Sequence, residues 1–314
     1  MTVVGVGQPA ADTESPPRVD AARRDRAWSL VAFGGVVGLA AFLYVWNLTV
    51  SGFANTYYSA AAQAASQSWS AFFFGSLDAA NFITIDKPPF STWIMGLSVR
   101  LFGLSPAAIL LPEALAGVAT VAVLFATVRR SFGPASATIA GLVMALTPGA
   151  VLMFRYNNPD AVLTLLLVIA AALLARGLEA GRIRWAVAAA VVVGLAFLTK
   201  YLQAYLVLPA FALVWLIAAP GSLRRRIAGL AASAVSVVLA SGWWVAIVEL
   251  IPTGSRPFIG GSETDSAVDL LLGYDGLGRL FGAAGPGRGG AGGGGFGGGG
   301  FGGDPGLLRL CNDQ

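Results

Sequence analysis

Four short clusters of charged and amide residues interrupt an otherwise apolar sequence. A charge at the centre of a membrane helix costs about 2.5–3.5 kcal/mol on insertion scales, so charges near a bilayer usually have a partner or a function. If the four clusters meet on one side of a membrane, they form a candidate site. The clusters are Asp86-Lys87-Pro88-Pro89, Arg155-Tyr156-Asn157-Asn158-Pro159-Asp160, Thr199-Lys200 and Ser255-Arg256-Pro257.

The charges in these clusters suit the transfer of a group from a phosphate to a hydroxyl. Lys87, Lys200 and Arg256 are cations, and both side-chain types bind phosphate or pyrophosphate. Asp86 and Asp160 are carboxylates, which can take a proton from an attacking hydroxyl or orient it. Polyprenyl phosphates carry their head groups at the membrane surface. The clusters therefore fit glycosyl transfer from a lipid-linked donor.

The segment after the first apolar run supplies further polar and aromatic candidates. From Thr56 onward its pattern predicts an amphipathic helix in the membrane interface, with aromatic side chains at the headgroup level. A plain aromatic belt explains Phe72-Phe73-Phe74 at least as well as a sugar site does. Asn55, Tyr57 and Tyr58 are better candidates for orienting a substrate, because they directly follow the first span.

The composition identifies an integral membrane protein. Of 314 residues, 56% are hydrophobic and 11% are charged, whereas a soluble domain has about 25% charged residues. The net charge of +4 is modest and the basic residues lie in short loops, which indicates topology rather than nucleic-acid binding. The chain has no histidine and one cysteine, Cys311. This excludes a His-ligated metal, a Ser-His-Asp triad and an internal disulfide, and a divalent metal would need oxygen ligands.

The apolar runs and arginines predict a polytopic, all-α transmembrane helix bundle of about seven spans. Arginines flank these runs so that the N-terminus lies in the cytoplasm and the four polar clusters face outside, provided that 48–106 makes no net crossing. Its apolar stretch from Phe90 to Gly103 is short and carries Arg100, so we interpret it as an interfacial or re-entrant helix, with a tilted span as the alternative. The seven runs are 28–47, 107–128, 134–153, 161–176, 185–200, 202–219 and 227–250.

The remaining segments predict the domain organisation. Residues 1–26 are polar and predict a disordered cytoplasmic tail, and 27–282 form the transmembrane domain. Residues 283–306 are rich in glycine and predict a flexible loop, because such a segment cannot bury enough surface to offset its backbone entropy. Residues 307–314 restart an apolar pattern, which suggests a truncated form or a fragment of a longer protein.

Several segments together resemble the family 39 glycosyltransferases, which have the GT-C membrane fold. This family includes the protein O-mannosyltransferases and the lipid A aminoarabinose transferase, and the chain is most similar to an actinobacterial and Firmicute branch. The resemblance spans residues 28–310. It is carried by the segments from Gly52 to Tyr58, Asp86 to Pro89, Tyr156 to Asp160, Thr199 to Tyr205, Arg256 to Ser262 and Gly273 to Arg279.

The resemblance implies an inverting transfer of one sugar from a polyprenyl-phosphate donor to a lipid, glycan or protein acceptor. The resemblance also implies that this reaction takes place on the extracytoplasmic face of the cell membrane. The family's catalytic carboxylate usually follows the first span, where this chain has Asn55. An amide cannot act as a general base, so either Asp86 or Asp160 takes that role, or this branch has moved the base to another position. Asn157 and Asn158 belong to a matching segment and join the residues expected to orient the substrate.

Two other functions are compatible with a membrane helix bundle. A transporter places polar residues near the bilayer midplane on broken helices, often with internal repeats. Here the spans are almost free of charge and show no repeat. A catalytically inert, truncated membrane protein is the second alternative.

Overall fold

The computed structural model describes residues 18–272 of the chain and contains helices joined by short loops. Its β structure within these residues is limited to two isolated bridges, Ser76 with Thr84 and Ile83 with Phe258. The all-α prediction is confirmed. The helices are α1 (Arg18–Val45), η1 (Leu48–Ser51), α2 (Thr56–Gln67), α3 (Trp69–Phe74), α4 (Phe90–Phe102), α5 (Pro106–Leu146), α6 (Pro148–Phe154), α7 (Asp160–Ala180), α8 (Ile183–Lys200), η2 (Tyr201–Val207), α9 (Leu208–Ala218), α10 (Leu223–Leu250), η3 (Thr253–Ser255) and α11 (Ala267–Leu272).

Five segments within the described residues are long and apolar enough to cross a membrane, compared with about seven expected. The difference arises because two of the five segments, Pro106–Leu146 and Ile183–Ala218, each include two of the predicted runs. α5 leaves helical geometry at Gly133, with φ of 84°, and η2 separates α8 from α9. The five segments are Ala27–Ser51, Pro106–Leu146, Asp160–Ala180, Ile183–Ala218 and Leu223–Leu250.

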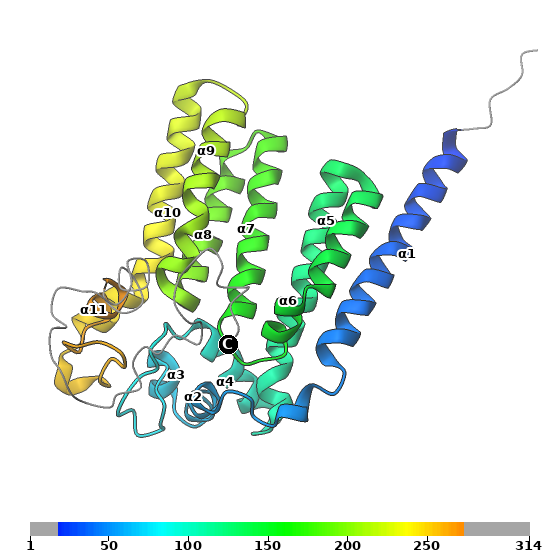
Figure 1. The fold of residues 1–314 in the computed structure, drawn as a ribbon. Helices are drawn as coiled ribbons and strands as arrows, with labels where there is room; N and C mark the ends of the chain where they lie inside the picture. The colour runs from blue at the N-terminus through cyan, green and yellow to red at the C-terminus, as the bar shows by residue number, and fades with distance from the viewer. Residues whose placement is uncertain (1–17, 273–314) are drawn as a thin grey trace, which may run out of the picture.

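Both interruptions reverse the direction of the chain. A Cβ on Gly141 would lie 3.5 Å from the Phe125 ring, so the two halves of α5 pack against each other. Tyr205 in η2 stacks on Phe197 of α8, with ring centroids 4.9 Å apart. Figure 1 shows α5 folding back on itself. α9 returns toward the start of α8 and packs against α7 and α10, and a Cβ on Gly181 would lie 2.9 Å from Pro220.

The predicted boundaries at the two termini differ from the structure or lie outside it. α1 begins at Arg18, so the last part of the polar segment 1–26 is helical rather than disordered. The glycine-rich segment 283–306, the segment 307–314 and the matching segment from Gly273 to Arg279 lie outside the described residues.

The long segment between α1 and α5 folds into three helices at one end of the bundle, α2, α3 and α4 (Figure 1). α4 has 13 residues, which is shorter than a span. Its charged residue is accommodated locally, because the Arg100 guanidinium lies 3.7 Å from the Trp69 ring and donates a hydrogen bond to the Ala65 carbonyl at 2.9 Å. The interfacial position of these helices stays a prediction.

Small residues allow the main helices to approach closely. A Cβ on Gly194 of α8 would lie 2.4 Å from the Cβ of Ala240 in α10, and one on Gly117 of α5 would lie 2.4 Å from the Phe154 ring. Membrane helices associate largely through such close contacts, because burial away from water does not drive helices together inside lipid.

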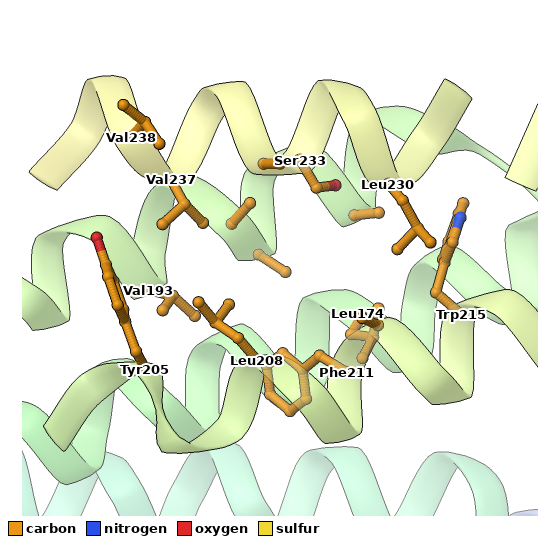
Figure 2. Close-up of a pocket in the computed structure, with 15 residues that line it drawn as sticks. Leu174, Val193, Tyr205, Leu208, Phe211, Trp215, Leu230, Ser233, Val237 and Val238 are labelled. Atoms are coloured by element: carbon orange, nitrogen blue, oxygen red, sulfur yellow. The ribbon is translucent and has the colours of Figure 1, made fainter. Parts of the chain in front are cut away.

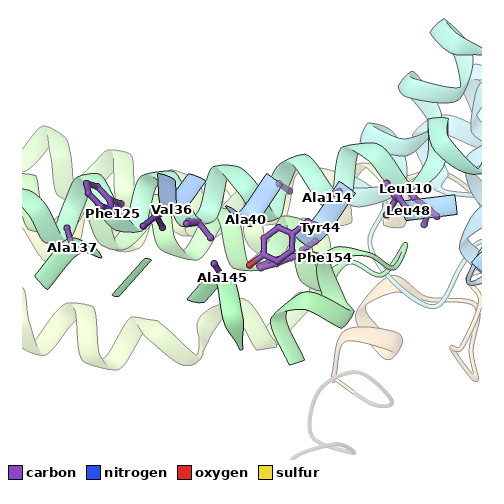
Figure 3. Close-up of a cluster of buried hydrophobic side chains, with 13 residues drawn as sticks. Val36, Ala40, Tyr44, Leu48, Leu110, Ala114, Phe125, Ala137, Ala145 and Phe154 are labelled. Carbon is purple, nitrogen blue, oxygen red and sulfur yellow. The ribbon is translucent and has the colours of Figure 1, made fainter. Parts of the chain in front are cut away.

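A buried cluster joins α1, α5 and α6. Tyr44 packs on Phe154 with ring centroids 5.1 Å apart, and its hydroxyl donates to the Met144 carbonyl at 3.2 Å (Figure 3). Val36 and Phe125 extend the cluster along the helices. α6 is thereby fixed against α1 and α5, and it leads directly into the Arg155–Asp160 segment.

Arginine-rich loops gather at the other end of the bundle. Arg130 in α5 forms an ion pair with Glu179 near the end of α7. Arg225, at the start of α10, donates to the Gly181 carbonyl at 2.7 Å. These contacts bring the loops that carry the arginines to a common end, as the topology prediction requires.

Candidate functional site

Two aspartate–lysine pairs contain four of the residues predicted from the sequence. The Nζ of Lys87 lies 2.6 Å from Oδ2 of Asp86, and the Nζ of Lys200 lies 2.6 Å from Oδ1 of Asp160. Lys87 is 4% exposed and Lys200 15%, whereas the aspartates are about a quarter exposed, at 24% and 28%. Each pair therefore presents its carboxylate more openly than its cation.

The Asp86–Lys87 pair is held by an extended segment and a tyrosine. The Asp86 amide donates to the Tyr57 hydroxyl oxygen at 2.9 Å. Upstream, the Thr84 amide donates to the Phe258 carbonyl at 2.9 Å, and the Gly260 amide donates to Oγ1 of Thr84 at 3.0 Å. Two prolines follow the pair and restrict the backbone before α4 begins.

The second pair lies where α7 begins and α8 ends. Asp160 is the first residue of α7, where a carboxylate is favoured by the helix dipole, and Lys200 is the last residue of α8, where a cation is favoured. The chain turns sharply after Lys200, since Tyr201 has a φ of 44°. The direct contact between them joins α7 to α8 at this end.

Asn157 connects the two regions of the site. Its Oδ1 accepts from the Asn55 amide at 2.8 Å, and its Nδ2 donates to the Asn55 carbonyl and to Oγ of Ser59, both at 2.8 Å. Asn55 is two residues from Tyr57, which contacts Asp86, and Asn157 is three residues from Asp160. The predicted clusters at 55–58, 86–89, 157–160 and 199–200 are thus linked by direct contacts.

Several predicted site residues have structural contacts that sequence alone did not indicate. Oδ1 of Asn55 accepts from the Tyr57 amide at 3.1 Å and caps α2. Tyr58 is buried in the cluster that contains Ile85 and Met95. Asn157 is fully buried, and Oδ1 of Asn158 accepts from the Asp160 amide at 3.4 Å. These residues shape the site, and their contact with a substrate stays a prediction.

Arg256 braces the segment that packs beside Asp86. Its side chain is 3% exposed and contacts Asp265 through both Nη atoms, at 3.2 Å to Oδ1 and 2.5 Å to the carbonyl. The following glycines approach the site closely, because a Cβ on Gly261 would lie 3.3 Å from the Cβ of Asp86. Arg256 therefore has a clear local role, and the predicted contact with a lipid phosphate is untested.

Two residues of this region were assigned no role from the sequence. Arg155 donates to the carbonyls of Leu43, Trp46 and Asn47 at 2.7, 2.8 and 3.1 Å, so it caps the end of α1. Glu113 is fully buried in α5, and its Oε1 accepts from the Ser91 hydroxyl at 3.0 Å. A single carboxylate inside the apolar run 107–128 is the signal that could have identified it.

Within residues 18–272, no group of three or more His, Cys, Asp or Glu side chains is placed to hold a metal. The site does contain a carboxylate oxygen, Oδ1 of Asp86, that is shielded from solvent and has no hydrogen-bond partner among these residues. Its other oxygen contacts Lys87. One oxygen of Asp86 is therefore engaged by Lys87, and the other has an unused acceptor position.

An apolar cavity of about 410 Å³ lies elsewhere, between α7, α8, α9 and α10. Figure 2 shows its lining of Leu174, Phe211, Trp215 and other apolar side chains, with Ser233 and Tyr205 as the labelled hydroxyl-bearing residues. None of the predicted site residues lines it. The cavity is therefore separate from the two aspartate–lysine pairs.

Comparison with known proteins identifies relatives of this chain. The chain is 42% identical over 251 residues to "Putative mannosyltransferase YkcB" of Bacillus subtilis (strain 168) and 41% identical over 243 residues to "Putative mannosyltransferase YycA" of the same organism. These matches cover 80% and 77% of this chain but 35% and 36% of the relatives, so the chain spans little more than a third of their length.

The structure is similar to the crystal structure of ArnT from Cupriavidus metallidurans in the apo state. The TM-score is 0.54 at 25% identity, over 72% of this chain and 42% of that one. A family model described as dolichyl-phosphate-mannose-protein mannosyltransferase matches residues 86–245, which is just over half of the chain and includes both aspartate–lysine pairs. The chain therefore belongs to this membrane mannosyltransferase family.

Proposed function

We propose that the chain carries part of the catalytic site of a membrane glycosyltransferase, which moves one sugar from a polyprenyl-phosphate donor to an acceptor hydroxyl with inversion. The observation that carries this proposal is the linked arrangement of two aspartate–lysine pairs at one end of the helix bundle. The family description and the names of both Bacillus relatives make mannose the first sugar to test.

In the proposed reaction the acceptor oxygen attacks the anomeric carbon and the bond to the lipid phosphate breaks. A carboxylate takes the proton of the hydroxyl, and the lysines stabilise the departing phosphate. Asp86 suits the role of base because its Oδ1 has no hydrogen-bond partner in the part of the chain that the structure describes. Asp160 suits the role of orienting Lys200, which it contacts directly.

We further propose that the site end of the bundle faces away from the cytoplasm and that the acceptor is a lipid, glycan or protein there. The gathering of arginine loops at the opposite end supports this orientation through the positive-inside rule. Because the chain spans little more than a third of its relatives' length, we propose that the activity belongs to a protein of the relatives' length, which is called the full-length protein below.

Separate Asp86→Asn and Asp160→Asn variants of the full-length protein test the chemistry. Transfer from labelled polyprenyl-phosphate mannose is measured in membranes, together with binding of the donor lipid. A base contributes about 10²–10⁴-fold, so we expect Asp86→Asn to lose roughly that much turnover while it still binds donor. Glu179→Gln is the control, because Glu179 lies at the arginine-rich end. Turnover near the wild-type value in both aspartate variants would refute the mechanism.

A further inference from the structure

Glu113 is a buried carboxyl group inside an apolar helix. It is 0% exposed, and one of its oxygens accepts a hydrogen bond from Ser91 at 3.0 Å. Its other oxygen, Oε2, is buried without a partner, and within the described residues no lysine or arginine pairs with it. A buried polar group of this kind costs stability, so it is rarely present without a purpose.

The contact with Ser91 reaches the first aspartate–lysine pair. Ser91 is the second residue of α4, and the rigid Pro88-Pro89 dipeptide connects this helix to Lys87. A shift of the first turn of α4 is therefore transmitted to Asp86 and Lys87.

α5 also fixes the segment that leads to the second pair. Beyond Glu113, α5 packs against α6 as well as against α4. One turn further along α5, Gly117 lies against the ring of Phe154, the last residue of α6. The chain then continues through Asn157 to Asp160. α5 thus contacts both helices that flank the aspartates in the sequence, namely α4, which follows Asp86, and α6, which precedes Asp160.

We propose that Glu113 is a positioning residue that fixes the Asp86–Lys87 pair relative to Asp160 through its hydrogen bond with Ser91. This inference rests on the proposed function for its consequence in catalysis. A hydrogen bond that merely holds α4 to α5 would affect the amount of folded protein, whereas positioning affects turnover of the folded protein.

The first test uses Glu113→Leu, Glu113→Gln, Ser91→Ala and the double variant Ser91→Ala/Glu113→Leu in the full-length protein. Leucine removes the acceptor, whereas glutamine keeps it. We expect Glu113→Leu to lower turnover by roughly 10- to 100-fold with the KM for donor unchanged, because a displacement on the order of 1 Å can cost about 10²-fold. Glu113→Gln should retain most of the wild-type turnover. Ser91→Ala should lose turnover too, and the double variant should lose no more than Glu113→Leu.

A second test does not depend on sugar transfer. Spin labels at Phe82 and Leu152, which are 78% and 65% exposed, report the distance between the Asp86 segment and α6 in a Cys311→Ser background. We expect a broader distance distribution in Glu113→Leu and in Ser91→Ala, but a wild-type distribution in Glu113→Gln.

The outcomes separate the two proposals. If the wild-type protein transfers no sugar, the proposed function fails, and the spin labels still decide whether Glu113 positions the site. Wild-type turnover in Glu113→Leu, losses that multiply in the double variant, or an unchanged distance distribution would each overturn the role of Glu113.

Discussion

At the scale of single residues, the site depends on two ion pairs in which the lysine is more deeply buried than the aspartate. Lys87 is almost fully buried, and its charge is balanced in part by Asp86, which precedes it in the chain. Removing one member of a buried pair leaves an uncompensated charge, which is costly. A phosphate that enters the site would offer Lys87 a further anion and would leave Asp86 freer to accept a proton.

Lys87→Ala should therefore weaken binding of the polyprenyl-phosphate donor in the full-length protein, and Lys87→Arg should retain part of the affinity. The loss follows from removing a charge-assisted contact with the phosphate. Binding is measured with labelled donor lipid in detergent micelles. Arg225→Ala at the other end of the bundle serves as the control. Equal affinity of wild type and Lys87→Ala would remove Lys87 from the donor site.

The sequence was sufficient to predict that Asp86, Lys87, Asp160 and Lys200 lie at the same end of the bundle. Charged residues between apolar runs fall at helix ends, and the number of crossings determines which ends coincide. The contacts of Asn157 and Glu113 could not be predicted in this way. They join residues 102 and 22 positions apart, so they depend on how α4, α5 and α6 pack.

At the scale of elements, hydrogen bonds between irregular segments position the site. Asn157 uses its side-chain amide as a second peptide group, donating to and accepting from the backbone of Asn55. The 256–260 segment makes similar backbone contacts with 82–84. Each connection is made by few groups, so single substitutions can disrupt it.

Asn157→Ala should destabilise the protein, because it removes the buried hydrogen bond to Oγ of Ser59 and leaves the part-buried Asn55 amide and carbonyl without Asn157. Each unsatisfied buried group costs about 1–3 kcal/mol. Thermal unfolding in detergent measures the effect, and Asn158→Ala is a matched control with weaker contacts. An equal unfolding temperature in the two variants would contradict the role of Asn157 in holding the Asn55 segment.

Gly260→Ala should displace the segment that supports Asp86. A Cβ at this position would lie 2.1 Å from the carbonyl oxygen of Thr84, which is backbone and cannot rotate away. We expect reduced turnover and a lower unfolding temperature. Gly254→Ala tests the specificity of the effect, because its Cβ would meet no atom within 4 Å. Equal turnover and equal unfolding temperatures in the two variants would show that the 256–260 segment does not position Asp86.

At the scale of the whole molecule, the bundle separates two kinds of charge. Arginine loops occupy one end, and the aspartate–lysine pairs occupy the other. Hydropathy and loop charge predicted the helical class and this separation, since both are local properties of the sequence. They did not predict where helices approach closely, as Gly194 does with Ala240, because such contacts depend on three-dimensional packing.

The orientation can be tested with cysteines in a Cys311→Ser background of intact cells. A cysteine at Phe82 should react with an impermeant thiol reagent, whereas one at Ala180 should react only after the membrane is opened. Both positions are exposed and lie at opposite ends of the bundle. The arginine bias is the physical reason for this expectation. Labelling of Ala180 together with protection of Phe82 would invert the topology and place the site in the cytoplasm.

The reversal at Gly133 also has a consequence for biosynthesis. The halves 106–132 and 134–146 are joined by one residue outside helical geometry, and Arg129 and Arg130 lie just before it. Carrying those charges through lipid is costly, so they would stay on the side where the ribosome is. The two halves would then enter the bilayer together as a helical hairpin. A change at this tight turn would affect insertion during synthesis before it could affect the finished site.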